Sequence, residues 1–220
     1  MIIYNPNNED IIKKRLDNAE KLLSQIKSRY CFITGSFLYK KAYKDIDIFV
    51  ITRSKKKIKV KDRKANITII DFNSLHSLFY HSISKSCISK GFLPKKELKA
   101  TVSDYWDVIN EAIPTLLNQR NKYHKDVRSL ILYIEYFSNG NILDSFQLDE
   151  KINKFKDYKE ILNYVEKEVP ESIFNKVNKS YLRRFFYTQA GIYRDLSMYE
   201  AQKFLYNLSH FVINRSLKHG

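Results

Sequence analysis

The chain has 220 residues, enough for one or two domains with a buried core. Its two cysteines exclude a disulfide framework, and the absence of a signal pattern or a long apolar run leads us to expect a cytoplasmic protein with no membrane partner. The formal net charge of +15 is uneven, because residues 1–100 hold 22 Lys and Arg against 9 Asp and Glu, which gives +13 and leaves +2 for residues 101–220.

The first predicted element is a helix from about Asn8 to Ser28. Asn8 suits the N-cap position, and Glu9 and Asp10 place negative charge in the first turn, where the helix dipole favours it. Apolar side chains recur at helical spacing on one face: Ile11, Ile12, Leu16, Ala19, Leu22, Leu23 and Ile26. We therefore expect an amphipathic helix.

A short buried strand is predicted at residues 30–33, followed by a Gly-Ser turn. Gly35 allows backbone N–H groups to approach a ligand closely. Ser36 is expected to cap a short helix around residues 37–42, whose N-terminus would favour an anion. The turn is therefore a candidate phosphate-binding loop.

Asp45 and Asp47 open the next predicted strand. Strand side chains alternate between faces, so the two carboxylates point the same way, about 7 Å apart along the strand. A pair at this spacing can hold one or two divalent cations, and its self-repulsion indicates a functional site. Lys40 and Lys44 precede the pair and are either phosphate ligands or ordinary exposed loop lysines.

A strongly strand-like run at residues 67–72 carries Asp71 near its end, and this is the expected third carboxylate. Between the two strands, residues 58–61 alternate and predict a strand with one polar face. The basic residues of 53–64 are expected either to contact nucleic acid or to guard an exposed sheet edge against aggregation. These two interpretations are equally compatible with the sequence.

These motifs, over roughly residues 8–90, resemble the polymerase β-like nucleotidyltransferase superfamily. The resemblance implies a small mixed sheet flanked by helices and transfer of a nucleotidyl group from a nucleoside triphosphate to an acceptor hydroxyl with two Mg²⁺ ions. It implies that Gly35 and Ser36 meet the triphosphate and that Asp45 and Asp47 bind the metals. It also implies that Asp71 holds the catalytic metal and helps to activate the acceptor.

Ser74 is expected to cap a further helix that ends near Lys90 and Gly91. His76 and His81 lie on it without a Cys or carboxylate partner at ligand spacing, which argues against zinc. Residues 91–99 are the expected junction. The predicted domains are therefore a catalytic domain at residues 1–93 and a helical bundle at residues 100–220.

The second half is predicted to be helical, which makes the whole chain α+β. A helix is expected over residues 103–137, with Pro114 kinking or breaking it, the apolar residues 130–134 at the buried centre of the bundle, and residues 138–141 ending it. Further helices are expected at residues 149–168, 171–177, 181–196 and 197–217. Arg183 and Arg184, beside several aromatic residues, either clamp an acceptor base or border a core.

The acceptor is expected to be an RNA end, possibly of tRNA, because Lys and Arg neutralise phosphates and the charge is concentrated in the catalytic half. A general bias of the proteome toward lysine would add positive charge to both halves of the chain alike, which the counts do not show. Alternatives are a small hydroxylated molecule and a protein hydroxyl, as in toxin–antitoxin nucleotidyltransferases. A different class of alternative is an RNA-binding scaffold without catalysis.

Overall fold

The computed structural model describes residues 1–54 and 58–169, which form two compact units. The first unit is Met1–Ala100 with Ile142–Glu150, and the second is Thr101–Asn141 with the described residues from Lys151 on. The expected limits of 1–93 and 100–220 differ from this division in two respects. The predicted junction belongs to the first unit, and a short later segment returns to it.

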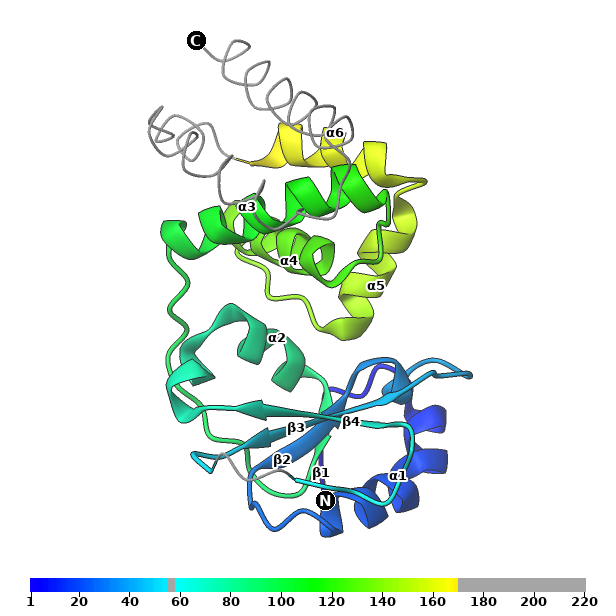
Figure 1. The fold of residues 1–220 in the computed structure, drawn as a ribbon. Coiled ribbons are helices and arrows are strands. Elements are labelled where there is room, and N and C mark those ends of the chain that lie inside the picture. Colours follow the sequence, from blue (N-terminus) through cyan, green and yellow to red (C-terminus); the bar gives the residue numbers. More distant parts are fainter. Residues whose placement is uncertain (55–57, 170–220) are drawn as a thin grey trace, which may run out of the picture. The chain divides into compact units, whose positions relative to one another are not determined.

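The first unit is built on a five-stranded mixed sheet with the order β1-β5-β2-β3-β4 (Figure 1). Its strands are β1 (Ile2–Tyr4), β2 (Cys31–Thr34), β3 (Ile46–Ile51), β4 (Ala65–Ile70) and β5 (Cys87–Ser89). β3 and β4 are parallel, and every other neighbouring pair is antiparallel. The expected mixed sheet is confirmed.

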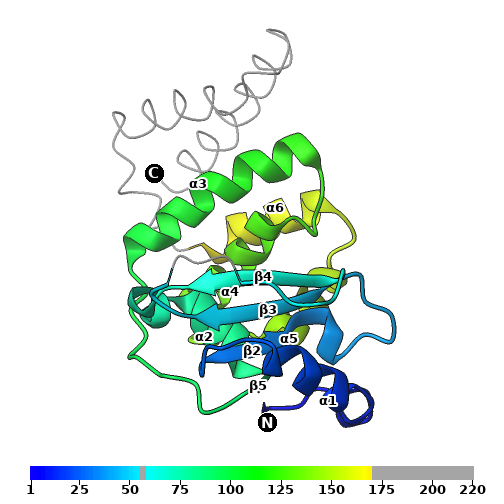
Figure 2. The same cartoon turned by 60° about the horizontal axis from the view of Figure 1, so that its bottom comes forward.

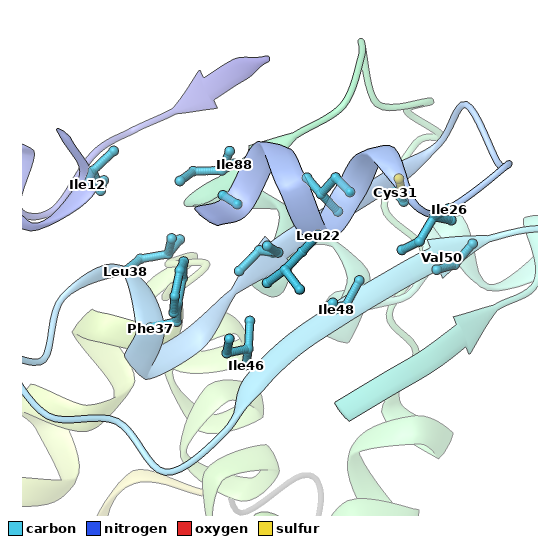
Figure 3. Packing of buried hydrophobic residues seen from close by; sticks show 13 residues of the cluster. Ile12, Leu22, Ile26, Cys31, Phe37, Leu38, Ile46, Ile48, Val50 and Ile88 are labelled. Carbon is cyan, nitrogen blue, oxygen red and sulfur yellow. The ribbon is translucent and has the colours of Figure 1, made fainter. Parts of the chain in front are cut away.

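Helix α1 (Glu9–Ser24) packs on one face of this sheet. Its N-cap is Asn8, as predicted, whose side chain accepts a hydrogen bond from the Ile11 N–H at 3.0 Å. Figure 3 shows the resulting core, in which side chains of α1 meet those of the central strands. The buried members of this cluster are Ile12, Ala19, Leu22, Leu23, Ile26, Cys31, Ile33, Phe37, Leu38, Ile46, Ile48, Val50 and Ile88.

Helix α2 (Leu78–Lys85) packs on the opposite face (Figures 1 and 2). Ser77 caps it, with the hydroxyl accepting from the Tyr80 N–H at 3.2 Å. The prediction of Ser74 as the cap is wrong, because Ser74 lies inside the preceding 3₁₀ helix η2 (Phe72–His76). The core on this side contains Phe32, Phe49, Ile51, Ile70, Leu75, Tyr80, Ile83, Cys87 and Leu93.

Two elements differ from expectation because long-range packing decides them. The helix predicted to reach Lys90 ends at Lys85, since the residues of β5 pair with β1 and β2 instead. The strand predicted at residues 58–61 does not form. A connection between parallel strands must cross a face of the sheet, and here Ile58 and Val60 pack on the α1-side core.

The second unit is helical in all its regular structure among the described residues. It contains α3 (Val102–Gln119), α4 (Lys125–Asn139), α6 (Tyr158–Glu168) and the later part of α5 (Ser145–Lys154), which begins in the first unit. Leu130, Ile131, Leu132 and Ile134 of α4 are buried, as expected for this apolar run.

The helical region expected over residues 103–137 is two helices, but the break is not at Pro114. α3 passes through Pro114 without ending and stops at Arg120, which is left-handed with φ of 52°. His124 then caps α4, its ring nitrogen Nδ1 accepting from the Asp126 N–H at 3.3 Å. Gly140 ends α4 with φ of 68°, as its position in the sequence predicted.

None of the helices among the described residues combines the length and apolar character that a membrane span requires. Cys31 and Cys87 are both buried free thiols. The helices expected at residues 171–177, 181–196 and 197–217, and the pair Arg183 and Arg184, lie outside the described residues.

Candidate functional site

The Gly-Ser turn and the aspartate pair meet at one end of the sheet. β2 and β3 are antiparallel with Thr34 opposite Asp47, so the turn that follows β2 lies beside the start of β3. Gly35 has φ of +79°, and a Cβ atom built on it would lie 2.8 Å from Asp47 Oδ2. Glycine is therefore required here both by the backbone conformation and by the carboxylate packed against it.

Ser36 is the second residue of the 3₁₀ helix η1 (Gly35–Leu38). The prediction that Ser36 caps a following helix is wrong, because the N-cap position belongs to Thr34, which makes no side-chain capping bond. Phe37 and Leu38 are buried beside Ile46 in the α1-side core, which Figure 3 shows, so hydrophobic packing holds the turn next to β3. The half-buried Ser36 has no hydrogen bond to its hydroxyl among the described residues.

Asp45 and Asp47 are both half-buried at the start of β3. Because Ile46 and Ile48 face the α1-side core, the alternation of the strand turns Asp47 to the α2 side. Asp45 immediately precedes the strand and is two residues from Asp47. Asp47 is therefore brought against the turn, and Asp45 lies two residues before it in the chain.

Asp71 is not brought to this site. In the parallel register of β3 and β4, Asp47 lies opposite Asn66, whereas Ile51 at the far end lies opposite Ile70. Asp71 follows Ile70, so it lies about 16 Å along the strand from Asn66. Its carboxylate is exposed and accepts a hydrogen bond from the Asn73 N–H at 2.7 Å, which indicates a turn residue.

Asn66 occupies the place beside Asp47 where a third carboxylate was expected. Its exposed side chain amide donates a hydrogen bond to Asp47 Oδ1 at 3.3 Å. An amide carries no negative charge and does not accept a proton as a carboxylate does, although its oxygen can serve as a metal ligand. The site is thus two carboxylates and an amide.

The two lysines predicted to meet phosphates differ in their surroundings. Lys40 forms an ion pair with Asp149 of α5, with Nζ and Oδ2 2.6 Å apart. Asp149 is buried and also accepts a hydrogen bond from the Tyr39 hydroxyl at 2.8 Å. Lys44 is exposed immediately before Asp45. Of the two, Lys44 is therefore the better candidate for a phosphate contact.

Arg15 of α1 holds the loop between the turn and the aspartates. Its guanidinium donates hydrogen bonds to the backbone carbonyl groups of Phe37, Lys40 and Lys41, those to Lys40 and Lys41 being 2.7 and 2.9 Å long. It also lies over the rings of Phe37 and Tyr43, at 5.2 and 4.5 Å from their centroids. One side chain thus fixes three successive parts of the loop.

The residues present fit one divalent cation better than two. Within residues 1–54 and 58–169, no three His, Cys, Asp or Glu side chains gather as a metal site. Mg²⁺ is commonly bound through one or two carboxylates together with phosphate oxygens of a substrate, and Asp45 and Asp47 are able to supply the carboxylates. The second ion that the family resemblance implies would lack its carboxylate, since Asn66 stands in that place.

Comparisons of the chain with protein-family models, with curated proteins and with solved structures found no match. The assignment of function therefore depends on the geometry of the site itself.

Sequence reasoning missed Asn66, Arg15 and Asp149. Asn66 lies one residue before the predicted start of its strand, and only the register of β4 against β3 places it opposite Asp47. Arg15 and Asp149 act through partners 22 or more residues away in the sequence, and no local pattern marks them.

Proposed function

We propose that this protein binds a nucleoside triphosphate together with a divalent cation and transfers its nucleotidyl group to an acceptor hydroxyl. The observation that carries the proposal is the approach of Gly35 to Asp47, which joins a glycine turn suited to phosphates to a carboxylate pair suited to a cation. These two elements are what a metal-complexed triphosphate needs from a protein.

In the proposed reaction, a bond forms between the acceptor oxygen and the α-phosphorus while the bond to pyrophosphate breaks. A bound Mg²⁺ would lower the pKa of the attacking group and balance charge on the leaving group. The chain's own residues bind and orient: the Gly35–Ser36 turn and Lys44 contact phosphates, while Asp45 and Asp47 hold the cation. In this proposal the same two carboxylates would accept the acceptor's proton.

For the acceptor we propose RNA. Lys59, Lys61, Arg63 and Lys64 are exposed. The backbone carbonyl of Lys64 accepts a hydrogen bond from the Ile46 N–H at 2.8 Å, so this basic segment ends beside the aspartate pair. Residues 58–61 form no strand, and the charge of this segment beside the aspartate pair suits the binding of phosphates of an RNA.

A second candidate function, binding without transfer, is favoured by Asn66. Without a third carboxylate, the site has one fewer group to hold a second cation or to activate an acceptor. Such a protein would use the Mg²⁺–triphosphate complex as a ligand and RNA as a partner.

The test uses the full chain with Mg²⁺, each α-labelled nucleoside triphosphate in turn, and total cellular RNA. Variants Asp47→Asn and Asn66→Asp are compared with Asp17→Asn, which removes an exposed carboxylate of α1 outside the site. Binding of each unlabelled nucleotide is measured in parallel by calorimetry.

Label entering RNA with the wild type and Asp17→Asn, but not with Asp47→Asn, would establish the transferase. Nucleotide binding without label in RNA, protein or small molecules, with transfer gained in Asn66→Asp, would establish the binding function instead. If the wild type binds no nucleotide with Mg²⁺, both proposals are wrong.

A further inference from the structure

An exposed aromatic side chain lies on the same face of the sheet as Asp47. Phe49 is two residues after Asp47 on β3 and faces the same side. The ring of Phe79 on α2 packs against it with centroids 5.9 Å apart and an interplanar angle of 66°. Phe79 nevertheless remains 48% exposed, so its ring is open to a ligand.

The neighbouring strand presents polar side chains beside Asp47 and Phe49. Asn66 lies opposite Asp47 and Thr68 lies opposite Phe49, and both are exposed. From Asp47 to Phe49 the strand advances about 7 Å, and the ring of Phe79 packs on that of Phe49. A strip of surface therefore begins with carboxylate and amide groups and ends in an exposed aromatic ring.

This order of groups matches the order of groups in a nucleotide. Phosphates and their cation require the charged end, a ribose requires hydrogen-bonding partners, and a nucleobase presents a flat π-face. Stacking of a base on an aromatic side chain contributes about 1–3 kcal/mol and tolerates any of the bases. A nucleobase that covers Phe79 would explain why this ring is exposed beside a site suited to phosphates.

We propose that Phe79 is the stacking surface for the base of the nucleoside triphosphate whose phosphates bind at Gly35, Ser36, Asp45 and Asp47. This inference rests on the proposed function and adds the position of the base to it. Because a stacking contact does not read hydrogen-bonding groups, it also implies weak discrimination among bases at this point.

The chain provides a matched control in Phe92, which is 76% exposed. Phe92 follows Gly91, where an added Cβ atom would lie 3.7 Å from the Arg29 carbonyl oxygen, just before β2 begins. Gly35, in contrast, follows the end of β2. Phe92 therefore lies toward the other end of the sheet. Its replacement removes the same exposed ring without touching the strip.

The experiment measures Kd by calorimetry for two probes with Mg²⁺: a nucleoside triphosphate and inorganic tripolyphosphate, which lacks the base. The wild type is compared with Phe79→Leu, Phe79→Trp and Phe92→Leu. We expect Phe79→Leu to weaken binding of the nucleotide roughly 5- to 150-fold and to leave tripolyphosphate binding unchanged. Phe79→Trp should retain nucleotide affinity, and Phe92→Leu should change neither Kd.

A fluorescent triphosphate with 2-aminopurine as its base supplies an independent readout, since stacking on Phe79 should quench it in the wild type and less so in Phe79→Leu. Equal affinity of the wild type for both probes would overturn the base site while leaving the phosphate site intact. Equal weakening of both probes in Phe79→Leu would show a structural role instead and also overturn it. Failure of the wild type to bind tripolyphosphate or nucleotide would overturn the proposed function itself.

Discussion

Gly35 and Asp47 are fitted to each other: the hydrogen of the glycine occupies the place where a methyl group would lie 2.8 Å from the carboxylate oxygen. The contact joins the turn after β2 to the first residues of β3. The position of the carboxylate thus depends on the absence of a side chain twelve residues earlier.

Replacing Gly35 with alanine should therefore harm both stability and cation binding. We expect a loss of about 1–2 kcal/mol in the free energy of unfolding from the left-handed backbone alone, and displacement of Asp47 in addition. Mg²⁺–triphosphate affinity, measured by calorimetry, should fall at least tenfold.

Substitutions at two other glycines separate the effect on stability from the effect on cation binding. Gly140→Ala has the same backbone strain, with φ of 68°, but nothing within 4 Å of the added methyl group, so it should lose stability and retain binding. Gly91→Ala meets only the Arg29 carbonyl oxygen at 3.7 Å and should change little. Wild-type nucleotide affinity in Gly35→Ala would contradict the proposed site.

Arg15→Lys should loosen the loop between the turn and the aspartates. A lysine ammonium lacks the planar fork that serves three carbonyl groups and two rings at once. We expect a loss of about 1–3 kcal/mol in denaturant unfolding. Weaker Mg²⁺–triphosphate binding should accompany it. Lys14→Met, at an exposed neighbouring position of α1, is the control and should alter neither quantity.

Glu135 should make the stability of the second unit depend on pH. Burial alone raises the pKa of Glu135, but hydrogen bonds from Lys151 and Tyr164, the charge of Lys151 and a hydrogen bond from Asn139 outweigh it and hold the pKa below its usual value. Because the pKa is lower in the folded state, ionised Glu135 stabilises the protein at pH values above its unfolded-state pKa of about 4.3. This stabilisation is lost as the pH falls through the folded-state pKa.

Glu135→Gln should accordingly lower the free energy of unfolding by about 1–3 kcal/mol at pH 7, since the partners Lys151 and Tyr164 lose a charged acceptor. The difference from the wild type should shrink as the pH falls below about 4. Urea unfolding at several pH values measures it. A difference that stays constant between about pH 7 and about pH 3 would show that the carboxylate charge is not the cause.

The basic segment predicts a salt-sensitive interaction with RNA. Replacing Lys59, Lys61, Arg63 and Lys64 with Gln should weaken RNA binding and reduce the slope of log Kd against log salt concentration, by about 0.7 for each phosphate of a single strand that the protein no longer neutralises. The control removes the same charge from exposed positions of the second unit: Lys125, Lys154, Lys156 and Lys159. Equal effects of the two sets would indicate non-specific attraction.

Local patterns were sufficient to predict the parts of the site that depend on neighbours in the sequence. The Gly-Ser turn and Asp45 and Asp47 lie at the ends of successive paired strands, so predicting the strands also predicts that they meet. The cap at Asn8 and the end of α4 at Gly140 depend on single residues with defined backbone preferences, and both were predicted.

The predictions that differ from the structure concern the register of strands and the choice of strand partners. Asp71 ends a strand that was correctly predicted, but the register of β4 against β3 brings Asn66 to the site instead. Residues of β5 have helical neighbours and become a strand only through pairing with β1 and β2. Tertiary pairing outweighs local propensity in such short elements.

The return of residues 142–150 to the first unit has a consequence for biosynthesis. Ser82 and Lys85 donate hydrogen bonds to the carbonyl groups of Leu143 and Ile142, each at 2.6 Å, and Lys40 pairs with Asp149. These partners are synthesised about 2–10 s after residue 100 at usual elongation rates. Until then, while the first two helices of the other unit are synthesised, these donors of the sheet unit have no partner from residues 142–150. Folding of the sheet unit is therefore completed only after part of the other unit has been made.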